Sequence, residues 1–71
     1  MVNVNKLRAK IVENGINIEA LANMSGINKA TIYRRLNQPD EITIEEADKL
    51  VKVLNIDANE ALAIFFTQYV A

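Results

Sequence analysis

The 71-residue sequence contains no cysteine and no histidine, one proline and two glycines. Without cysteine the chain can form neither a disulfide nor a thiolate metal site, and without histidine a metal would have to bind through carboxylates alone. Two residue types common in nucleophilic and acid–base catalysis, cysteine and histidine, are therefore missing, and there is no glycine-rich phosphate loop. We expect no enzyme, no cofactor and no metal site.

Long apolar runs are missing as well. No stretch approaches the roughly 20 apolar residues that a membrane span needs, and the opening MVNVNKLRAK does not resemble a signal peptide. A chain of this length forms one small core, so we expect a single domain over residues 1–71. A cytoplasmic protein without a membrane partner is the expectation.

Charge is divided unevenly along the chain. Residues 1–38 carry six lysines and arginines and two glutamates, a net charge of +4, whereas residues 39–71 carry two lysines and seven acids, a net charge of −5. Such asymmetry suggests that the first half meets an anion and the second does not.

Five segments have apolar residues at helical spacing, and no segment alternates with period two. The expected helices cover about residues 4–13, 18–25, 29–37, 44–54 and 58–70. In the fourth helix the expected buried stripe consists of Ile44, Ala47, Leu50, Val51 and Leu54. The sequence therefore predicts an all-α protein of five helices joined by short loops.

The ends of these helices carry recognisable signals. Gly15 and Gly26 can adopt the left-handed conformation that ends a helix without Cβ strain, and Pro39 disfavours a helical residue before it. The expected N-caps are Asn17, Asn28, Thr43 and Asp57. Thr43 and Asp57 each have a glutamate three residues later, which is the capping-box pattern.

The second and third helices, with Gly26 between them, form one spaced unit. Two short helices that cross steeply need a small residue at their closest approach and a residue that tolerates positive φ in the turn; Ala22 and Gly26 supply these. Apolar residues on either side of the turn are expected to pack between the two helices; these are Leu21, Ile27 and Ile32. This pattern predicts a helix-turn-helix at about residues 18–37.

The arrangement resembles the lambda-repressor-like (Cro/C1-type) helix-turn-helix family over about residues 5–56. The segment INKATIYRRLNQPDEITIEEADKLVKVLNI, followed by IFF, is most similar to small Cro-type regulators of phages of Gram-positive bacteria. The resemblance implies a five-helix DNA-binding domain with a core over residues 5–56, whose third helix enters the major groove. The sequence departs from the family at Ile18, where many members carry a glutamine that contacts the DNA backbone, and at Arg35, where members usually have an apolar residue.

Helical geometry decides which side chains of residues 29–37 face outward. At about 100° per residue, Ile32 and Leu36 lie about 40° apart and define the inward face. Arg34 then points away from the core, and Arg35 lies on the opposite flank from Tyr33. An exposed basic helix is commonly only a solvated face, but the preceding turn favours contact with DNA.

We expect the outward face and the first residues of this helix to contact base edges. The candidate base contacts are Asn28, Lys29, Ala30, Tyr33 and Arg34. The candidate phosphate contacts are Thr31, Arg35, Asn37, Lys6 and Lys10. For Arg35 an intramolecular carboxylate is the alternative partner, and Lys6 and Lys10 fit solvated surface equally well.

The last expected helix is apolar around nearly its whole circumference, which exceeds what one buried stripe requires. Either it wraps a very small core or part of it meets another chain, and apolar patches favour the interface. The candidate interface residues are Leu62, Ile64, Phe65, Phe66 and Tyr69. A homodimer, in solution or only on DNA, would match a palindromic operator.

These expectations define a sequence-specific transcriptional regulator that binds double-stranded DNA, of the phage or prophage Cro-like repressor type, acting by operator occlusion. The alternative is an anti-repressor, a protein-binding modulator that pairs with a repressor through its acidic C-terminal half. Substitutions at Arg34 should abolish the first function, and polar substitutions at Ile64 or Phe66 the second.

Overall fold

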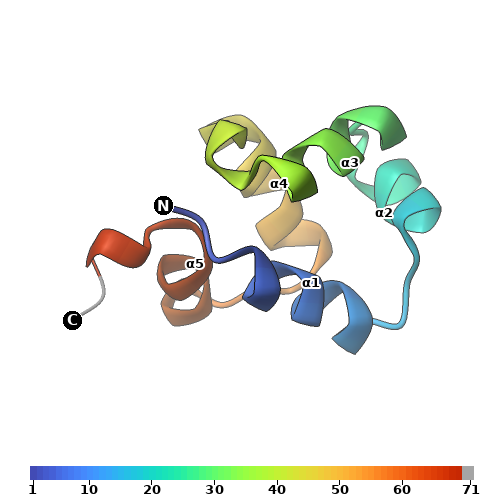
Figure 1. Ribbon diagram of the computed structural model, residues 1–71. Helices are drawn as coiled ribbons and strands as arrows, with labels where there is room; N and C mark the ends of the chain where they lie inside the picture. Colours follow the sequence, from blue (N-terminus) through green and yellow to red (C-terminus); the bar gives the residue numbers. More distant parts are fainter. Residues whose placement is uncertain (70–71) are drawn as a thin grey trace.

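The computed structural model describes residues 1–69, and all regular structure within them is helical (Figure 1). The elements are α1 (Val4–Glu13), α2 (Ile18–Ser25), α3 (Lys29–Asn37), the 3-10 turn η1 (Pro39–Glu41), α4 (Ile44–Val53), α5 (Ala58–Phe65) and the 3-10 turn η2 (Thr67–Tyr69). The prediction of an all-α, five-helix protein is confirmed. The expected helix over 58–70 is wrong in its extent, because α5 ends at Phe65 and a separate turn follows.

The five α-helices begin in the same way. An apolar residue precedes a polar N-cap, and a second apolar residue follows in the first turn or just beyond it. The side chain of each cap accepts a hydrogen bond from a backbone N–H of the first turn; the caps are Asn3, Asn17, Asn28, Thr43 and Asp57. The residues before the caps, which lie in or against the core, are Val2, Ile16, Ile27, Ile42 and Ile56. Flanking apolar residues of this kind fix the angle at which the chain enters a helix.

The predicted capping boxes are both present. In α4 the Thr43 side chain accepts from the Glu46 N–H while the Glu46 carboxylate accepts from the Thr43 N–H. Asp57 and Glu60 exchange the same pair of bonds at the start of α5. Each box satisfies two N–H groups that an isolated helix would leave without a partner.

The turn between α2 and α3 depends on Gly26. Its φ is 74°, in the left-handed region, and its N–H donates to the Ala22 carbonyl to close α2. The Ile27 N–H then donates to the Ser25 hydroxyl, which holds the chain as it enters α3. Figure 1 shows α2 and α3 side by side, as a helix-turn-helix requires.

The core consists of apolar side chains from all five helices, the turn between α2 and α3, and the loop before α5. Its most completely buried members are Leu7, Leu21, Leu54 and Ile64. No charged or polar residue of the described chain is fully buried. Ile44, which the sequence places on the buried stripe of α4, is 78 % exposed. It occupies the first position of the helix, where the chain has not yet turned toward the core.

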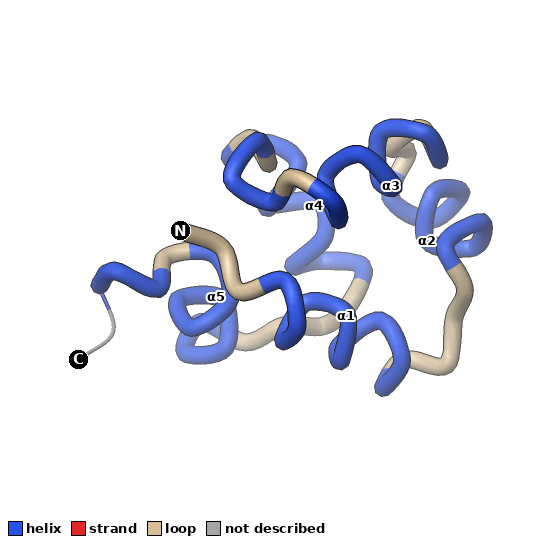
Figure 2. Tube along the Cα trace, viewed as in Figure 1, coloured by secondary structure: helices blue, strands red, loops and turns tan. Residues whose placement is uncertain are grey.

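The segment before α1 anchors α5. The Asn3 N–H donates to the Ile64 carbonyl at 2.7 Å, and the Thr67 N–H donates to the Met1 carbonyl at 3.3 Å. Figure 2 shows this loop, in tan, running beside α5. The first residues of the chain therefore hold the segment around the end of α5, and α5 packs against α1.

Replacing Gly26 by alanine should lower the free energy of unfolding by about 1–2 kcal/mol, since an L-residue in the left-handed conformation carries that strain. A Cβ at Gly26 would meet no atom within 4 Å, so collision adds nothing. Urea unfolding monitored by circular dichroism measures the change. Gly26→Asn is the control and should lose less, because asparagine tolerates this region. Equal stability of Gly26→Ala and the unsubstituted protein would contradict the account of the turn.

Candidate nucleic-acid interface

The outward side of α3 carries all five candidate base contacts. Asn28, Lys29, Ala30, Tyr33 and Arg34 are exposed. Ile32 and Leu36 are buried on the other side of the helix. The structure therefore gives α3 the orientation expected from helical spacing. It leaves a strip of one aromatic, two basic and two small or polar side chains open to a ligand.

Asn28 performs a local task at the start of this strip. Its carboxamide oxygen accepts from the Ala30 N–H at 2.8 Å and caps α3. Because an amide has one oxygen and one NH₂ group, the NH₂ group remains as the donor that an outside acceptor can use. Asn28 can thus begin the helix and contact a ligand at the same time.

Arg34 is the cation of α3 whose charge is not matched by a neighbour. Its Nη2 donates to the Thr31 hydroxyl at 3.2 Å, one turn back along the helix. Within residues 1–69 no carboxylate comes within 4 Å of its guanidinium. The fork is therefore held on the outward face with most of its donors available to an acceptor outside the protein.

Arg35 is in the opposite situation. Its Nε and Nη2 donate to the two carboxylate oxygens of Glu46 at 2.8 and 3.2 Å, and Nη1 lies 3.6 Å from Glu41. The Arg35 and Glu46 side chains are 22 % and 17 % exposed. Of the two roles expected for Arg35, the structure shows the intramolecular one, because a bidentate pair already uses the donors that a phosphate would need.

This ion pair lies directly on the apolar core. Arg35 and Glu46 line a small interior gap, about 10 Å³ in volume, together with Leu7, Leu21 and Leu36. The hydrogen bonds from Arg35 and from the Thr43 backbone lower the pKa of the Glu46 carboxyl, and the Glu46 carboxylate raises the pKa of Arg35. Glu46 therefore ties the end of α3 to the cap of α4 through one charged group.

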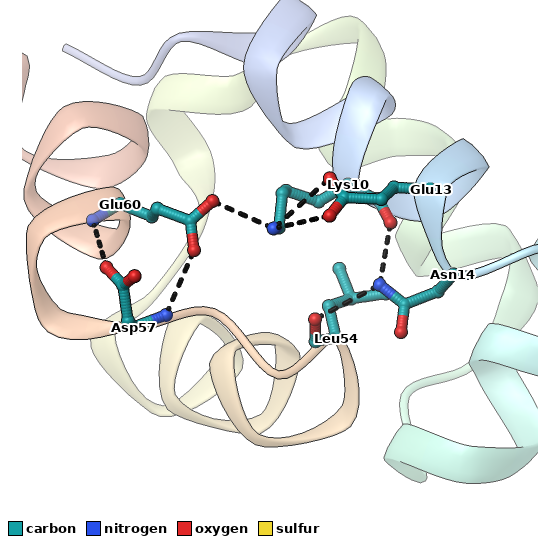
Figure 3. A network of polar contacts seen from close by, with 6 residues as sticks. All are labelled: Lys10, Glu13, Asn14, Leu54, Asp57 and Glu60. Atoms are coloured by element: carbon teal, nitrogen blue, oxygen red, sulfur yellow. Dashed lines mark hydrogen bonds and ion pairs between the residues drawn. The ribbon is translucent and has the colours of Figure 1, made fainter.

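Lys10 is also held within the protein. This corrects the expectation that it is available to contact a DNA phosphate. Its Nζ lies 2.8 Å from Glu60 of α5 and 3.2 Å from Glu13, and its side chain is 12 % exposed (Figure 3). The hydrogen bond with Glu60 raises the pKa of Lys10 and lowers that of Glu60. Beside this pair the Asn14 side chain donates to the Leu54 carbonyl at 3.0 Å. The network joins α1 to the start of α5.

The remaining phosphate candidates have different settings. Lys6 is exposed and lies on α1 beside Ala9 and Ala63, at the groove between α1 and α5. Thr31 is half-buried and receives the Arg34 hydrogen bond, and Asn37 is exposed at the end of α3. Thr31 and Asn37 thus share α3 with the candidate base contacts, while Lys6 comes from another helix.

The candidate interface at the C-terminal end is smaller than expected. Ile64 and Phe65 are 2 % and 6 % exposed and belong to the core of the single chain, which corrects their assignment to an interface. Leu62 is 45 % exposed, and Phe66 is half-buried against the core. The side chain of Tyr69 lies outside the described residues.

The glutamates that pair with the candidate cations were missed as site residues. Glu46 and Glu60 carry capping-box signals in the sequence, but those signals do not reveal that each also pairs with a cation on a distant helix. Glu19, on the first turn of α2, lies 3.9 Å from Lys29 across the turn, and no sequence pattern marks this contact.

The sequence model of the Helix-turn-helix family matches residues 7–60, from α1 into α5. Because this match covers well over half of the chain, the chain belongs to that family, and its fold is the lambda-repressor-like, Cro/C1-type domain. The class of protein is a DNA-binding transcription regulator. Searches of curated proteins and of solved structures find no significant match. In the described part of the chain no helix has the length and apolar composition needed to cross a membrane.

Glu46→Gln should make the free energy of unfolding depend less on pH in the acidic range. The folded-state pKa of Glu46 lies below its ordinary value of 4.5, so the charged pair contributes stability above about pH 4.5. That stability is lost as the pH falls through the lowered pKa. Glutamine can keep the capping box, so the variant isolates the charge. Urea unfolding should show a less stable variant at pH 7 and a difference that narrows steadily below pH 4.5.

The matched control for this experiment is Glu45→Gln, the neighbouring carboxylate, which pairs at 3.4 Å with Lys49 on the exposed side of α4. An exposed pair of this kind contributes about 0–1 kcal/mol at most. If the two variants show the same loss at pH 7 and the same pH profile, Arg35 and Glu46 do not form the stabilising pair described above.

Proposed function

We propose that this protein is a sequence-specific repressor that reads operator DNA with the outward face of α3. The observation that carries the proposal is the separation of two adjacent arginines. Arg35 is fixed inward by Glu46, and Arg34 is left outward with no carboxylate partner within residues 1–69. A helix that presents its outer side and first residues to base edges in the major groove would use this strip.

Each side chain of the strip suits a definite kind of contact. The Arg34 guanidinium matches the O6 and N7 acceptors of guanine. Ala30 is small enough to let the helix approach closely and can contact a thymine methyl group. Tyr33, Lys29 and the Asn28 amide supply donors along the same face. Thr31, Asn37 and Lys6 are the proposed phosphate contacts, which position the helix without reading sequence.

Repression by occlusion is the proposed mode, as in the phage Cro-type regulators that the sequence resembles. The residues that match the family model form one helical domain. A domain that covers promoter DNA needs no effector to act, so its concentration and its affinity for the operator would set the response.

We infer that two copies bind one palindromic operator. Of the six cations of the first half, Lys10 and Arg35 are held by carboxylates and Lys29 lies 3.9 Å from Glu19, which leaves Lys6, Arg8 and Arg34. Phosphate contacts dominate the affinity for DNA, so one copy alone binds weakly. The exposed side of α5, with Leu62 and the edge of Phe66, is the proposed contact between copies. Two recognition helices would then lie about 34 Å apart on one DNA face.

The anti-repressor function is the second candidate, and the exposure of Ile44 favours it. Ile44 is 78 % exposed on the acidic half, so most of its side chain is open to a partner. A repressor protein that bound this half would cover it. In that case the function would survive loss of Arg34 and fail on a polar substitution at Ile44.

Arg34→Ala should weaken binding to a preferred duplex by about fivefold to 150-fold, which corresponds to the 1–3 kcal/mol of one good base contact. The preferred duplex is the 20-base-pair sequence that the unsubstituted protein selects from a randomised library. Fluorescence anisotropy at fixed salt gives the affinity. Lys52→Ala removes an exposed cation from α4, outside the recognition helix, and is the control, with an expected change below twofold. Equal losses for the two variants would contradict a reading role for Arg34.

Leu62→Glu should prevent a second copy of the protein from binding to the same duplex. Placing a carboxylate on the exposed side of α5 introduces charge into the proposed contact at little cost to the monomer, because Leu62 is only half-covered in the single chain. Sedimentation velocity with a palindromic duplex should show two unsubstituted chains per duplex and one chain for the variant. Two copies of the variant per duplex would place the contact elsewhere.

A further inference from the structure

The outer side of the helix-turn-helix carries one acidic group close to the proposed base contacts. Glu19 lies on the first turn of α2, and its Oε2 is 3.9 Å from the Nζ of Lys29 at the start of α3. Both side chains are exposed, and they border a shallow hollow that Ala22, Asn23 and Asn28 also line. The carboxylate therefore lies next to the end of α3 that would approach DNA.

An ammonium group beside a carboxylate discriminates between two kinds of acceptor. Lys29 has three N–H donors, and at 3.9 Å it forms an ion pair with Glu19 without a hydrogen bond, so the donors can go to a neutral acceptor such as guanine O6 or N7. A phosphate oxygen is anionic, and placing it on the same ammonium brings it close to the Glu19 carboxylate. The like charges repel, and in the low-screening space between protein and DNA this repulsion is stronger than in bulk water.

We propose that Glu19 is a specificity-determining residue that acts through Lys29, a proposal that rests on the DNA-reading function of α3. Glu19 offsets the charge of Lys29 and so keeps the ammonium from binding the backbone of any duplex. Lys29 then contributes where a neutral base acceptor is presented in the right place. The carboxylate lowers affinity for random DNA more than affinity for the preferred sequence.

The chain offers a matched control pair on α4. Lys52 Nζ lies 2.9 Å from Asp48, and both side chains are exposed. This pair is at least as close as that of Glu19 and Lys29 but contains no residue of α3. Neutralising Asp48 therefore changes the net charge by the same amount as neutralising Glu19, without altering the neighbourhood of Lys29.

The test compares Glu19→Gln, Lys29→Gln, the double variant and Asp48→Asn. Each binds two duplexes over a salt series: the duplex selected by the unsubstituted protein and a scrambled duplex of equal composition. Glu19→Gln should raise affinity for the scrambled duplex about threefold to tenfold at 0.1 M salt and steepen its salt slope by about 0.9, the value for one added phosphate contact. The ratio of selected to scrambled affinity should fall.

The double variant decides whether the effect passes through Lys29. Without the ammonium, Glu19→Gln should change the scrambled affinity by less than twofold, as Asp48→Asn should in the unsubstituted background. Equal thermal unfolding midpoints would show that the change is not one of folding.

Three results would overturn the proposal. An equal gain on both duplexes, or the same gain in the Lys29→Gln background, would make Glu19 a general repulsive charge. No gain at all would remove its role in binding. Failure of the proposed function is separate: an unsubstituted protein with equal affinity for the selected and scrambled duplexes is not a sequence reader, and the role of Glu19 would fail with it.

Discussion

The burial of Ile32 and Leu36 on one side of α3 is the constraint from which the exposed surface follows. Once these two side chains enter the core, helical spacing leaves Ala30, Tyr33 and Arg34 outside. The turn at Gly26 holds α3 against α2 so that this face cannot rotate away. A core of a dozen apolar side chains thus determines which groups a ligand can meet.

Electrostatics then divides the cations into two sets. Lys10 and Arg35 serve the fold: each is largely buried and joins two helices through a glutamate that also caps a helix. Lys6, Arg8 and Arg34 have no carboxylate partner within residues 1–69, and Lys29 lies 3.9 Å from Glu19. The net basic charge of the first half therefore overstates what DNA would meet, which favours binding by few contacts and by more than one copy.

Sequence alone predicts what depends on neighbours in the chain. Helix caps and left-handed glycines could be predicted because each signal lies within a few residues of the chain. The predicted caps are Asn17, Asn28, Thr43 and Asp57. The end of α5 at Phe65, the burial of Ile64 and the partners of Arg35 and Lys10 could not be predicted. They depend on contacts between segments far apart in the chain, such as the Asn3–Ile64 hydrogen bond, which no local pattern encodes. The outward direction of Arg34 was predictable, because it follows from the helical step of about 100° per residue alone.

The most direct test of the account is the structure of the protein bound to its selected duplex. We expect α3 in the major groove, with the Arg34 guanidinium within hydrogen-bond distance of a base edge and Arg35 still paired with Glu46. A complex in which α3 faces solvent, or in which Arg35 leaves Glu46 to bind DNA while Arg34 does not, would contradict it.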